Sequence, residues 1–235
     1  MSRLRILTAN LLNGGADISR LQALLAEQRV DVACLQELSG RQASAIQEVL
    51  PFGKLEPGSG PSDHDGMGIA LRRPADVRRL AVGRRDARVA ELRPSDWPQL
   101  DAPLELLNVH IRAPHQFPWW RALLERRQQL TGLLEYLEAT PREQRLWLGD
   151  FNASPIWPLY RRMASHLPDI AATFAENRGA APRPTWGPTP GAPRLLRIDH
   201  AFGQGIQVAA LEVLPVPGSD HDALLLELTP EGTLV

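Results

Sequence analysis

The sequence predicts one α/β domain that spans residues 1–235 and contains mixed β-sheets. In the first part of the chain, apolar strand-like segments alternate with segments of helical periodicity, as is typical of α/β proteins. Later stretches contain several strands in succession, which favours mixed over purely parallel sheets. Only about 40 residues follow the Pro-rich loop at 182–193, which is marginal for an independent core, so no second domain is expected.

The N-terminal part of the chain predicts two strands, each followed by a helix. The segment 18–29 has apolar residues at helical spacing, and either Asp17 or Ser19 can cap its start. The segment 30–35 is almost wholly apolar, which favours a strand covered on both faces. The expected elements are a strand at 3–9, a helix at 18–29, a strand at 30–35, a helix at 40–50 that ends at Pro51, and a loop at 57–62.

The remainder of the chain is richer in strands. A long helix is expected at 119–138, because the segment follows Pro118 and carries apolar residues at helical spacing. A loop at 182–193 is rich in Pro and Gly. The other expected elements are a short helix at 155–165 and strands at 67–71, 77–82, 87–92, 104–111, 145–149, 197–202, 206–214 and 223–228.

The composition is that of an ordinary globular protein. Hydrophobic residues make up 43% of the 235 residues and charged residues 23%, which argues against a disordered, collagen-like or coiled-coil chain. The single cysteine, Cys34, lies in an apolar stretch, so we expect a buried thiol and neither a disulfide framework nor a cysteine zinc site. No apolar stretch approaches the ~20 residues that span a bilayer, and the N-terminus lacks the pattern of a signal peptide. We therefore expect a cytoplasmic protein.

The basic residues are almost all arginine. Lys54 is the single lysine among 26 basic residues. The base composition of a GC-rich genome is the favoured explanation, and the fit of the planar guanidinium to phosphate is the alternative. Eight arginines gather at residues 72–93, where they either track a nucleic acid or guard the exposed edges of a hairpin. The net charge of −1 weighs against a surface for long nucleic acid.

Polar residues stand at the ends of several predicted strands, where sites form in α/β sheets. Each of them alone has an ordinary role, as a turn former, a helix cap or a buried histidine, but their repetition favours a site. Carboxylate and amide oxygens without cysteine suit Mg²⁺ or Mn²⁺ better than zinc, and an Asp–His pair supplies a base poised near neutral pH. These residues are Asn10, Glu37, His110, Asp150, Asn152, Asp199, Asp220 and His221.

The motifs around these residues resemble those of the endonuclease/exonuclease/phosphatase superfamily, which includes deoxyribonuclease-I-like enzymes. The matching segments are 8–10 (Thr-Ala-Asn), 31–37 (Asp-Val-Ala-Cys-Leu-Gln-Glu), 68–71 (Gly-Ile-Ala-Leu), 108–110 (Asn-Val-His), 149–153 (Gly-Asp-Phe-Asn-Ala), 197–200 (Arg-Ile-Asp-His) and 219–221 (Ser-Asp-His). They follow the family's order and span nearly the whole chain. The resemblance implies a four-layer α/β sandwich of two packed mixed sheets flanked by helices, and metal-dependent hydrolysis of a phosphoester.

The resemblance also implies which residues of this chain hold the metal. Glu37 is the implied principal ligand, with Asn10 beside it and Asp220 close to the same ion. The implied ion is Mg²⁺, with Mn²⁺ as a substitute. We expect the protein to act as a monomer.

The remaining matched residues have implied roles in the reaction. His221 would contact the scissile phosphate and act as a general base or acid, oriented by Asp199. Asp150 would position or deprotonate the attacking water, and Asn152 would hold a phosphate oxygen. His110 would donate a hydrogen bond to the phosphate or assist the leaving group.

The resemblance leaves the substrate open between a nucleic acid, a phospholipid and a small phosphodiester or phosphomonoester. Trp186, Arg72 and His64 are candidate substrate contacts. His64 lies in the segment 62–65, which repeats the tetrapeptide of 219–222 in what is otherwise expected to be a solvated loop. The aromatic segment 117–121 forms either a membrane-facing or base-stacking lip or an anchor for its helix in the core, and the anchor is favoured.

Two further interpretations follow from the same residues. His200 adjoins Asp199, so strand alternation points it to the opposite face of the sheet and gives it a structural role. A binding module that kept this fold without catalysis is the alternative to an enzyme, and the intact set of polar residues favours the enzyme.

Overall fold

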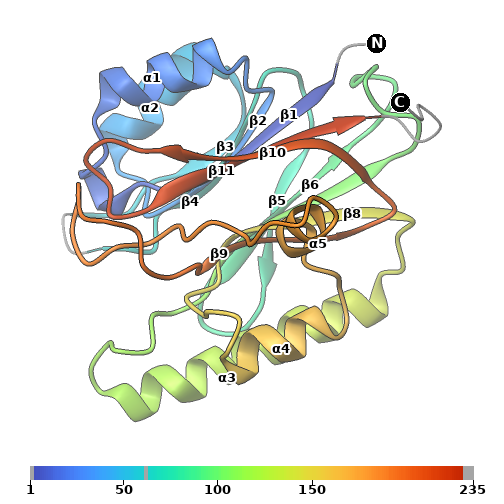
Figure 1. Ribbon diagram of the computed structural model, residues 1–235. Coiled ribbons are helices and arrows are strands. Elements are labelled where there is room, and N and C mark those ends of the chain that lie inside the picture. The colour runs from blue at the N-terminus through green and yellow to red at the C-terminus, as the bar shows by residue number, and fades with distance from the viewer. Residues whose placement is uncertain (1–2, 61–62, 230–235) are drawn as a thin grey trace.

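The computed structural model describes residues 3–60 and 63–229, and it has four layers (Figure 1). Two mixed β-sheets pack face to face, and helices cover the outer face of each sheet. The predicted α/β sandwich of two mixed sheets is thereby confirmed. Within the described ranges, none of the helices combines the length and the apolar character that crossing a bilayer requires.

The first sheet has the strand order β10-β11-β1-β2-β4-β3. β1 and β2 run parallel, and the other neighbours run antiparallel. Its strands are β1 (Leu4–Asn10), β2 (Val32–Gln36), β3 (Phe52–Glu56), β4 (Met67–Leu71), β10 (Gln207–Pro215) and β11 (Asp222–Thr229). Two helices pack on its outer face, α1 (Ile18–Glu27) and α2 (Gly40–Val49), which begin at the side-chain caps Asp17 and Ser39.

The second sheet has the order β5-β6-β7-β8-β9, with β7 and β8 parallel. Its strands are β5 (Val77–Ala81), β6 (Asp86–Leu92), β7 (Leu104–His110), β8 (Gln144–Asp150) and β9 (Asp199–Gln204). The long helix α3 (Trp119–Ala139) and the short helix α4 (Pro158–Ala164) cover its outer face. A further short helix, α5 (Ile170–Glu176), packs against β9 and β10.

Strand alternation divides the core into three apolar regions. Ile6 points into the region between the sheets, whereas Leu7 points toward α1 and α2. In the second sheet, Leu106 faces the first sheet and Leu107 faces α3. Both faces of β2 are covered, and its residues 32–35 are all apolar and buried, as the sequence predicts for residues 30–35.

Among the strands and α-helices described above, two have no counterpart in the sequence-based prediction. β3 is an edge strand whose Phe52, Gly53 and Lys54 are exposed, so it lacks the apolar face that would have identified it. α5 is short, and the signal that could have revealed it is its cap, because Asp169 accepts a hydrogen bond from the Ala172 N–H at 3.0 Å.

A buried polar contact joins the two sheets near the ends of β2 and β7. The Asn108 amide nitrogen donates to the carbonyls of Leu35 and Gly68, each at 2.8 Å, and its oxygen accepts from Gln36 at 2.6 Å. Unpaired polar groups are costly at such depth, so these hydrogen bonds fix one relative placement of the sheets. The contact thereby ties β7 of the second sheet to β2 and β4 of the first.

Candidate active site

The polar residues at the strand ends meet at one edge of the sandwich. Parallel pairing brings Asn10 of β1 beside Gln36 of β2, and His110 of β7 beside Asp150 of β8. Antiparallel β9 begins at the same edge, since Asp199 pairs with Asp150. A pocket of about 530 Å³ opens over this edge, and its lining includes Glu37, Asp150, Asn152, Asp220 and His221 together with His64 and Trp186.

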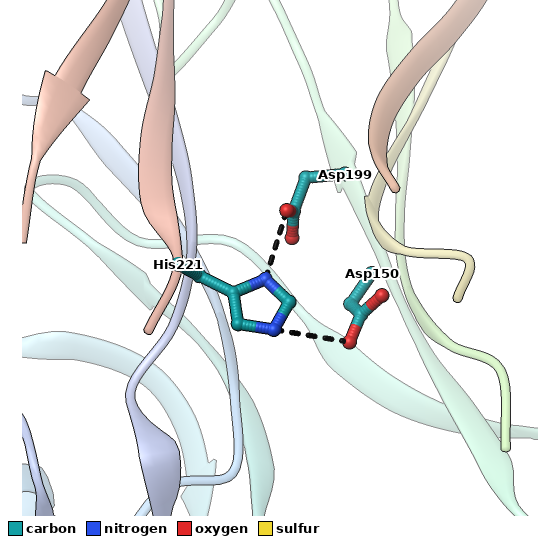
Figure 2. Close-up of side chains that lie close together, drawn as sticks. All are labelled: Asp150, Asp199 and His221. Carbon is teal, nitrogen blue, oxygen red and sulfur yellow. Dashed lines mark hydrogen bonds and ion pairs between the residues drawn. The ribbon is translucent and has the colours of Figure 1, made fainter. Parts of the chain in front are cut away.

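His221 lies between two carboxylates (Figure 2). Its Nδ1 is 2.8 Å from Asp199 Oδ2, and its Nε2 is 3.9 Å from Asp150 Oδ2. Burial by itself lowers the pKa of His221, but the negative charges of Asp199, Asp150 and Asp220 outweigh it and raise the pKa to about 10. The imidazole is therefore held as a cation at neutral pH, with Asp199 fixing its orientation.

Asp150 is the buried carboxylate that faces His221 and the pocket. The pKa of Asp150 is raised to about 7, mainly by burial and further by the negative charges of Asp199 and Glu37. The positive charge of His221 and the hydrogen bond from the Asn152 N–H act in the opposite direction. Its Oδ1 accepts from the Asn152 N–H at 2.8 Å, and its Oδ2 accepts from the Asn152 amide at 2.9 Å. A carboxylate with this pKa can exchange a proton near neutral pH.

A glycine places Asp150 at its strand end. Gly149 has φ of +140°, and a Cβ at this position would lie 1.9 Å from the Val109 carbonyl oxygen. A side chain would therefore push β8 away from β7 at the residue before Asp150. The close approach of these two strands therefore requires glycine at position 149.

Asn10 joins the carboxylates of the two sheets. Its amide nitrogen donates to Glu37 Oε1 at 3.2 Å and to Asp150 Oδ2 at 3.1 Å, while its oxygen accepts from the Leu12 N–H at 3.0 Å. Glu37 follows β2 and has φ of +50°, a left-handed conformation that is uncommon for this residue type. Asn152 has φ of +49°. Residues held in such conformations concentrate at functional sites, where the surroundings impose them.

Three further side chains surround the acidic group. His64 Nδ1 lies 2.5 Å from Glu37 Oε2, which brings the loop before β4 onto the site. His110 Nε2 is 3.8 Å from Glu37 Oε1 and 3.7 Å from Asp150 Oδ2, and the Arg85 guanidinium lies on the ring. Burial, together with the positive charge of Arg85, lowers the pKa of His110 well below its usual range. His110 is therefore neutral at physiological pH.

Asp220 contributes a carboxylate at the wall of the pocket. The Trp186 indole N–H donates to Asp220 Oδ2 at 3.0 Å, and Oδ1 is buried with no hydrogen-bond partner in the part of the chain that the structure describes. A buried carboxylate oxygen without a donor is costly unless a cation or water satisfies it. At the edge of the sheet beneath the pocket, Asp150, Asp199 and His221 are buried and offer ligand atoms within 4.8 Å of one another, which is a composition that can hold a cation.

Most of the candidate residues are therefore gathered in one place. His64 belongs to this group rather than to a separate solvated loop, although Ser62 of its tetrapeptide lies outside the described residues. Arg72 is the exception: it follows β4 at the opposite end of the sheet, where it donates to the Val30 carbonyl and faces Asp31 at 3.5 Å. Antiparallel pairing explains the difference, because β4 begins beside Gln36 and ends beside Val32.

The arginines at 72–93 do not form a free basic stripe. Most of them form ion pairs with acidic side chains, so little uncompensated positive charge remains to bind a polyanion. The ion pairs are Arg72–Asp31, Arg79–Glu56, Arg84–Glu125, Arg85–Asp65, Arg88–Glu56 and Arg93–Glu91.

The sequence alone indicated no positioning role for Thr185 or Arg85, and it showed Ser219 only as part of a motif. The Thr185 hydroxyl donates to Asp199 Oδ2 at 2.6 Å, and its proximity to Trp186 was the available signal. The Ser219 hydroxyl, within the recognised Ser-Asp-His motif, donates to the Asn10 carbonyl and accepts from the His221 N–H. Nothing in the sequence separates Arg85 from its neighbouring arginines, because its contact joins the connection between β5 and β6 to His110 on β7, 25 residues away.

Comparison with known proteins agrees with this geometry. A family model described as "Endonuclease/Exonuclease/phosphatase family" matches residues 7–221. A search of curated proteins finds no match. Among solved structures, a conserved protein of unknown function from Enterococcus faecalis has a TM-score of 0.72 at 19% identity, covering 97% of this chain and 100% of that chain.

Two other similar structures contain a bound product or anion. TDP2 from D. rerio, complexed with a single-strand DNA product, has a TM-score of 0.71 at 17% identity, covering 97% of this chain and 100% of that chain. The human Nocturnin catalytic domain with a bound sulfate anion has a TM-score of 0.66 at 17% identity, covering 97% and 94%. These likenesses show the fold, and the family model covers most of the sequence. The chain belongs to the endonuclease/exonuclease/phosphatase family, whose members hydrolyse phosphoesters.

Proposed function

We propose that this protein is a divalent-cation-dependent phosphoester hydrolase in which water attacks phosphorus. The observation that carries the proposal is that Glu37, Asp150 and His221 line one pocket, with Asp199 behind His221. The group unites a fixed imidazolium, a carboxylate that titrates near neutral pH and an excess of negative charge. In in-line hydrolysis, the imidazolium neutralises charge on the phosphate oxygens, the carboxylate accepts the proton of water, and the excess of negative charge favours the binding of a cation.

The donor atoms of the pocket fit a hard cation. Glu37 and Asp220 supply carboxylate oxygens, one of which, Asp220 Oδ1, has no partner among the described residues. We assign the cation to these two residues, with Asn10 orienting Glu37. The Nδ1 of His221 is already engaged by Asp199 and its ring is cationic, so we do not assign the ion to the imidazole. When bound, Mg²⁺ or Mn²⁺ supplies Lewis-acid stabilisation of charge on the phosphoryl oxygens.

The protein's own residues divide the remaining tasks. His221 presents its charged Nε2 to a phosphate oxygen, and Asp199 and Thr185 hold the ring in place. Asp150 accepts the proton of the attacking water. The Asn152 side chain donates to Asp150 and to the Ile111 carbonyl, and so fixes this carboxylate in its orientation. His110, which is neutral, offers a hydrogen bond at the same edge of the pocket.

The proposal is tested with the activated diester bis(p-nitrophenyl) phosphate and either Mg²⁺ or Mn²⁺. We expect turnover that chelation abolishes and that Glu37→Gln lowers by about 10³-fold, because a principal ligand charge is lost. Glu48→Gln, an exposed carboxylate on α2, is the matched control and retains activity. Full activity of Glu37→Gln would refute the assignment. Absence of both turnover and metal binding in calorimetry would favour the non-catalytic binding module.

The substrate is distinguished by a panel of plasmid DNA, RNA, sphingomyelin, inositol phosphates and nucleotides with Mg²⁺. Nucleic acid is one candidate, since a structural neighbour was solved with a DNA product. The compensated charges of the arginines at 72–93 do not favour a long polyanion over the other candidates. A monomeric, cytoplasmic protein remains our prediction from the sequence.

A further inference from the structure

An exposed apolar surface lies beside the mouth of the pocket. We call it the apolar rim; it is formed by Phe117, Trp119, Trp120, Leu123, Leu124 and Ile156. The exposed fractions reach 89% for Phe117, 74% for Ile156, 61% for Trp119 and 58% for Trp120. The sequence favoured an anchoring role in the core for this aromatic segment, and that expectation is wrong. Exposed patches of large apolar side chains mark contact surfaces in soluble proteins.

Packing of α3 does not require the aromatic residues of the rim. The helix packs Leu130, Leu133 and Leu134 against the second sheet. Trp120, Leu123, Leu124 and Arg127 follow the spacing of one helical stripe and are all exposed. The outward stripe is therefore available to a partner, whereas the inward stripe holds the helix in the fold.

The rim is continuous with the candidate active site. Trp157 lines both the catalytic pocket and a groove of about 550 Å³ between α3 and α4, which Leu123 and Leu159 also line. Figure 1 shows α3 and α4 together on the outer side of the second sheet. The rim also has an apolar counterpart at the pocket, because Leu196 lines it and is 44% exposed, and the adjacent Leu195 is 66% exposed. The pocket thus opens between apolar side chains.

The charges that surround the rim are positive. Arg121 and Arg127 on α3, and Arg161 and Arg162 on α4, are exposed. Between residues 111 and 134, all of which the structure describes, the single acidic residue is Glu125, which is buried and ion-paired with Arg84, Arg112 and Arg121. From 153 to 164, also described throughout, there is no acidic residue.

We propose that the apolar rim docks on the surface of an anionic lipid bilayer. Tryptophan and aliphatic side chains insert at the interface between headgroups and acyl chains, and arginines beside them bind the negative headgroups. A second copy of this chain fits less well, because a two-fold contact through this face would oppose the same arginines to one another. If the protein has the proposed hydrolase function, docking also presents the pocket to a phosphoester of a lipid headgroup; this consequence rests on the proposed function.

Vesicle sedimentation tests docking without any turnover. The full chain is mixed with vesicles of phosphatidylcholine, with and without phosphatidylserine, and the bound fraction is measured. We expect binding that requires the anionic lipid, that Trp119→Ala/Trp120→Ala lowers by more than about tenfold, and that Arg127→Ala lowers by about fivefold. Phe52→Ala, an exposed aromatic on β3, and Arg41→Ala, an exposed arginine on α2, are matched controls that leave binding unchanged.

The outcomes separate this proposal from the proposed function. We expect Glu37→Gln to bind vesicles like the wild type, because docking does not involve the metal ligands. Hydrolysis of the soluble diester measures catalysis separately, without lipid. No binding to either vesicle, or unchanged binding by the tryptophan double variant, overturns the docking proposal. A dimer in light scattering that the same double variant converts to monomer, without vesicle binding, assigns the rim to a second copy instead.

Discussion

Two aspartate–histidine pairs occupy opposite faces of β9. Asp199 pairs with His221 at 2.8 Å beneath the pocket, whereas the next residue, His200, faces Asp169 at 3.4 Å among aromatic rings. Arg197 completes the second group with an ion pair to Asp169 at 2.6 Å, and the His200 Nε2–H donates to the Ala153 carbonyl at 2.7 Å. The same residue types therefore serve two different purposes.

The two groups differ in charge balance and in access to the pocket. At the pocket, Glu37, Asp150, Asp199 and Asp220 outnumber the cations, which leaves negative charge for a ligand to neutralise. Around Asp169, the guanidinium of Arg197 and the Tyr160 hydroxyl satisfy the carboxylate. A buried, compensated group stabilises one structure, whereas an uncompensated one beside a cavity is available for chemistry.

The largest expected difference is catalytic. His221→Ala lowers kcat/KM for bis(p-nitrophenyl) phosphate by about 10³-fold, because the charged Nε2 is lost from the phosphate. Steady-state kinetics with saturating Mg²⁺ measures this effect. His166→Ala, an exposed histidine after α4, is the control and retains the wild-type rate. A His221→Ala enzyme with normal kinetics would place the chemistry elsewhere.

The second group is expected to affect stability instead. Asp169→Asn leaves the Arg197 guanidinium buried without its counter-ion and lowers the free energy of unfolding by about 3 kcal/mol. Urea unfolding monitored by circular dichroism measures the loss. The folded variant keeps kcat/KM near the wild-type value, since Asp169 does not line the pocket. A large loss of kcat/KM with unchanged stability would reverse the distinction between the two groups.

The pH dependence of stability has opposite sign in the two groups. The pKa of His221 is raised from 6.5 to about 10. The contribution of its ionisation to the free energy of unfolding is therefore complete below pH 6.5 and is lost as the pH rises toward 10. Burial raises the pKa of Asp169, but the hydrogen bond and charge of His200 and the charge of Arg197 outweigh it and hold the pKa below 3.8. The Asp169 contribution is therefore present above pH 3.8 and is lost as the pH falls.

Metal-free protein provides the test of these signs. The free energy of unfolding is expected to fall by a few kcal/mol between pH 6.5 and 10, at ~1.4 kcal/mol per pKa unit, and His221→Ala flattens this decline. Asp169→Asn is expected to reduce the loss of unfolding free energy at acidic pH and to leave the decline at alkaline pH unchanged. If the His221→Ala profile kept the alkaline slope of the wild type, the imidazolium between Asp199 and Asp150 would be excluded.

The smallest expected effect concerns orientation within the first group. Thr185→Val removes the hydroxyl that donates to Asp199 Oδ2 and lowers kcat/KM by about tenfold, because His221 is held less firmly. Thr185→Ser retains the hydroxyl and is expected to restore most of the activity. Equal losses in both variants would indicate a packing role for the buried side chain.

The fold class and most of the candidate site could be predicted from local sequence. Apolar segments define the central strands. Parallel pairing brings the end of β1, at Asn10, beside the end of β2, and the end of β7 beside Asp150, whereas only the packing of the two sheets brings these two ends together. β3 escaped prediction because an exposed edge strand has no apolar face. α5 escaped because a helix of two turns provides little periodicity.

Tertiary structure decided which of the remaining polar residues join the site. His64 and Arg72 flank the same strand and were equal candidates in the sequence. The antiparallel pairing of β4 with β2 places the first beside Glu37 and the second at the far edge. The roles of Arg85 and Thr185 likewise depend on partners distant along the chain.

The sequence by itself determined the alternation of strands and helices, the positions of the strand-end carboxylates and the opposite directions of Asp199 and His200, because these depend on local periodicity. Only the tertiary structure decided that Trp119 and Trp120 face outward and that Asp169 is neutralised by Arg197. Exposure and charge compensation are set by the elements that pack around a side chain, and a segment cannot encode its neighbours by itself.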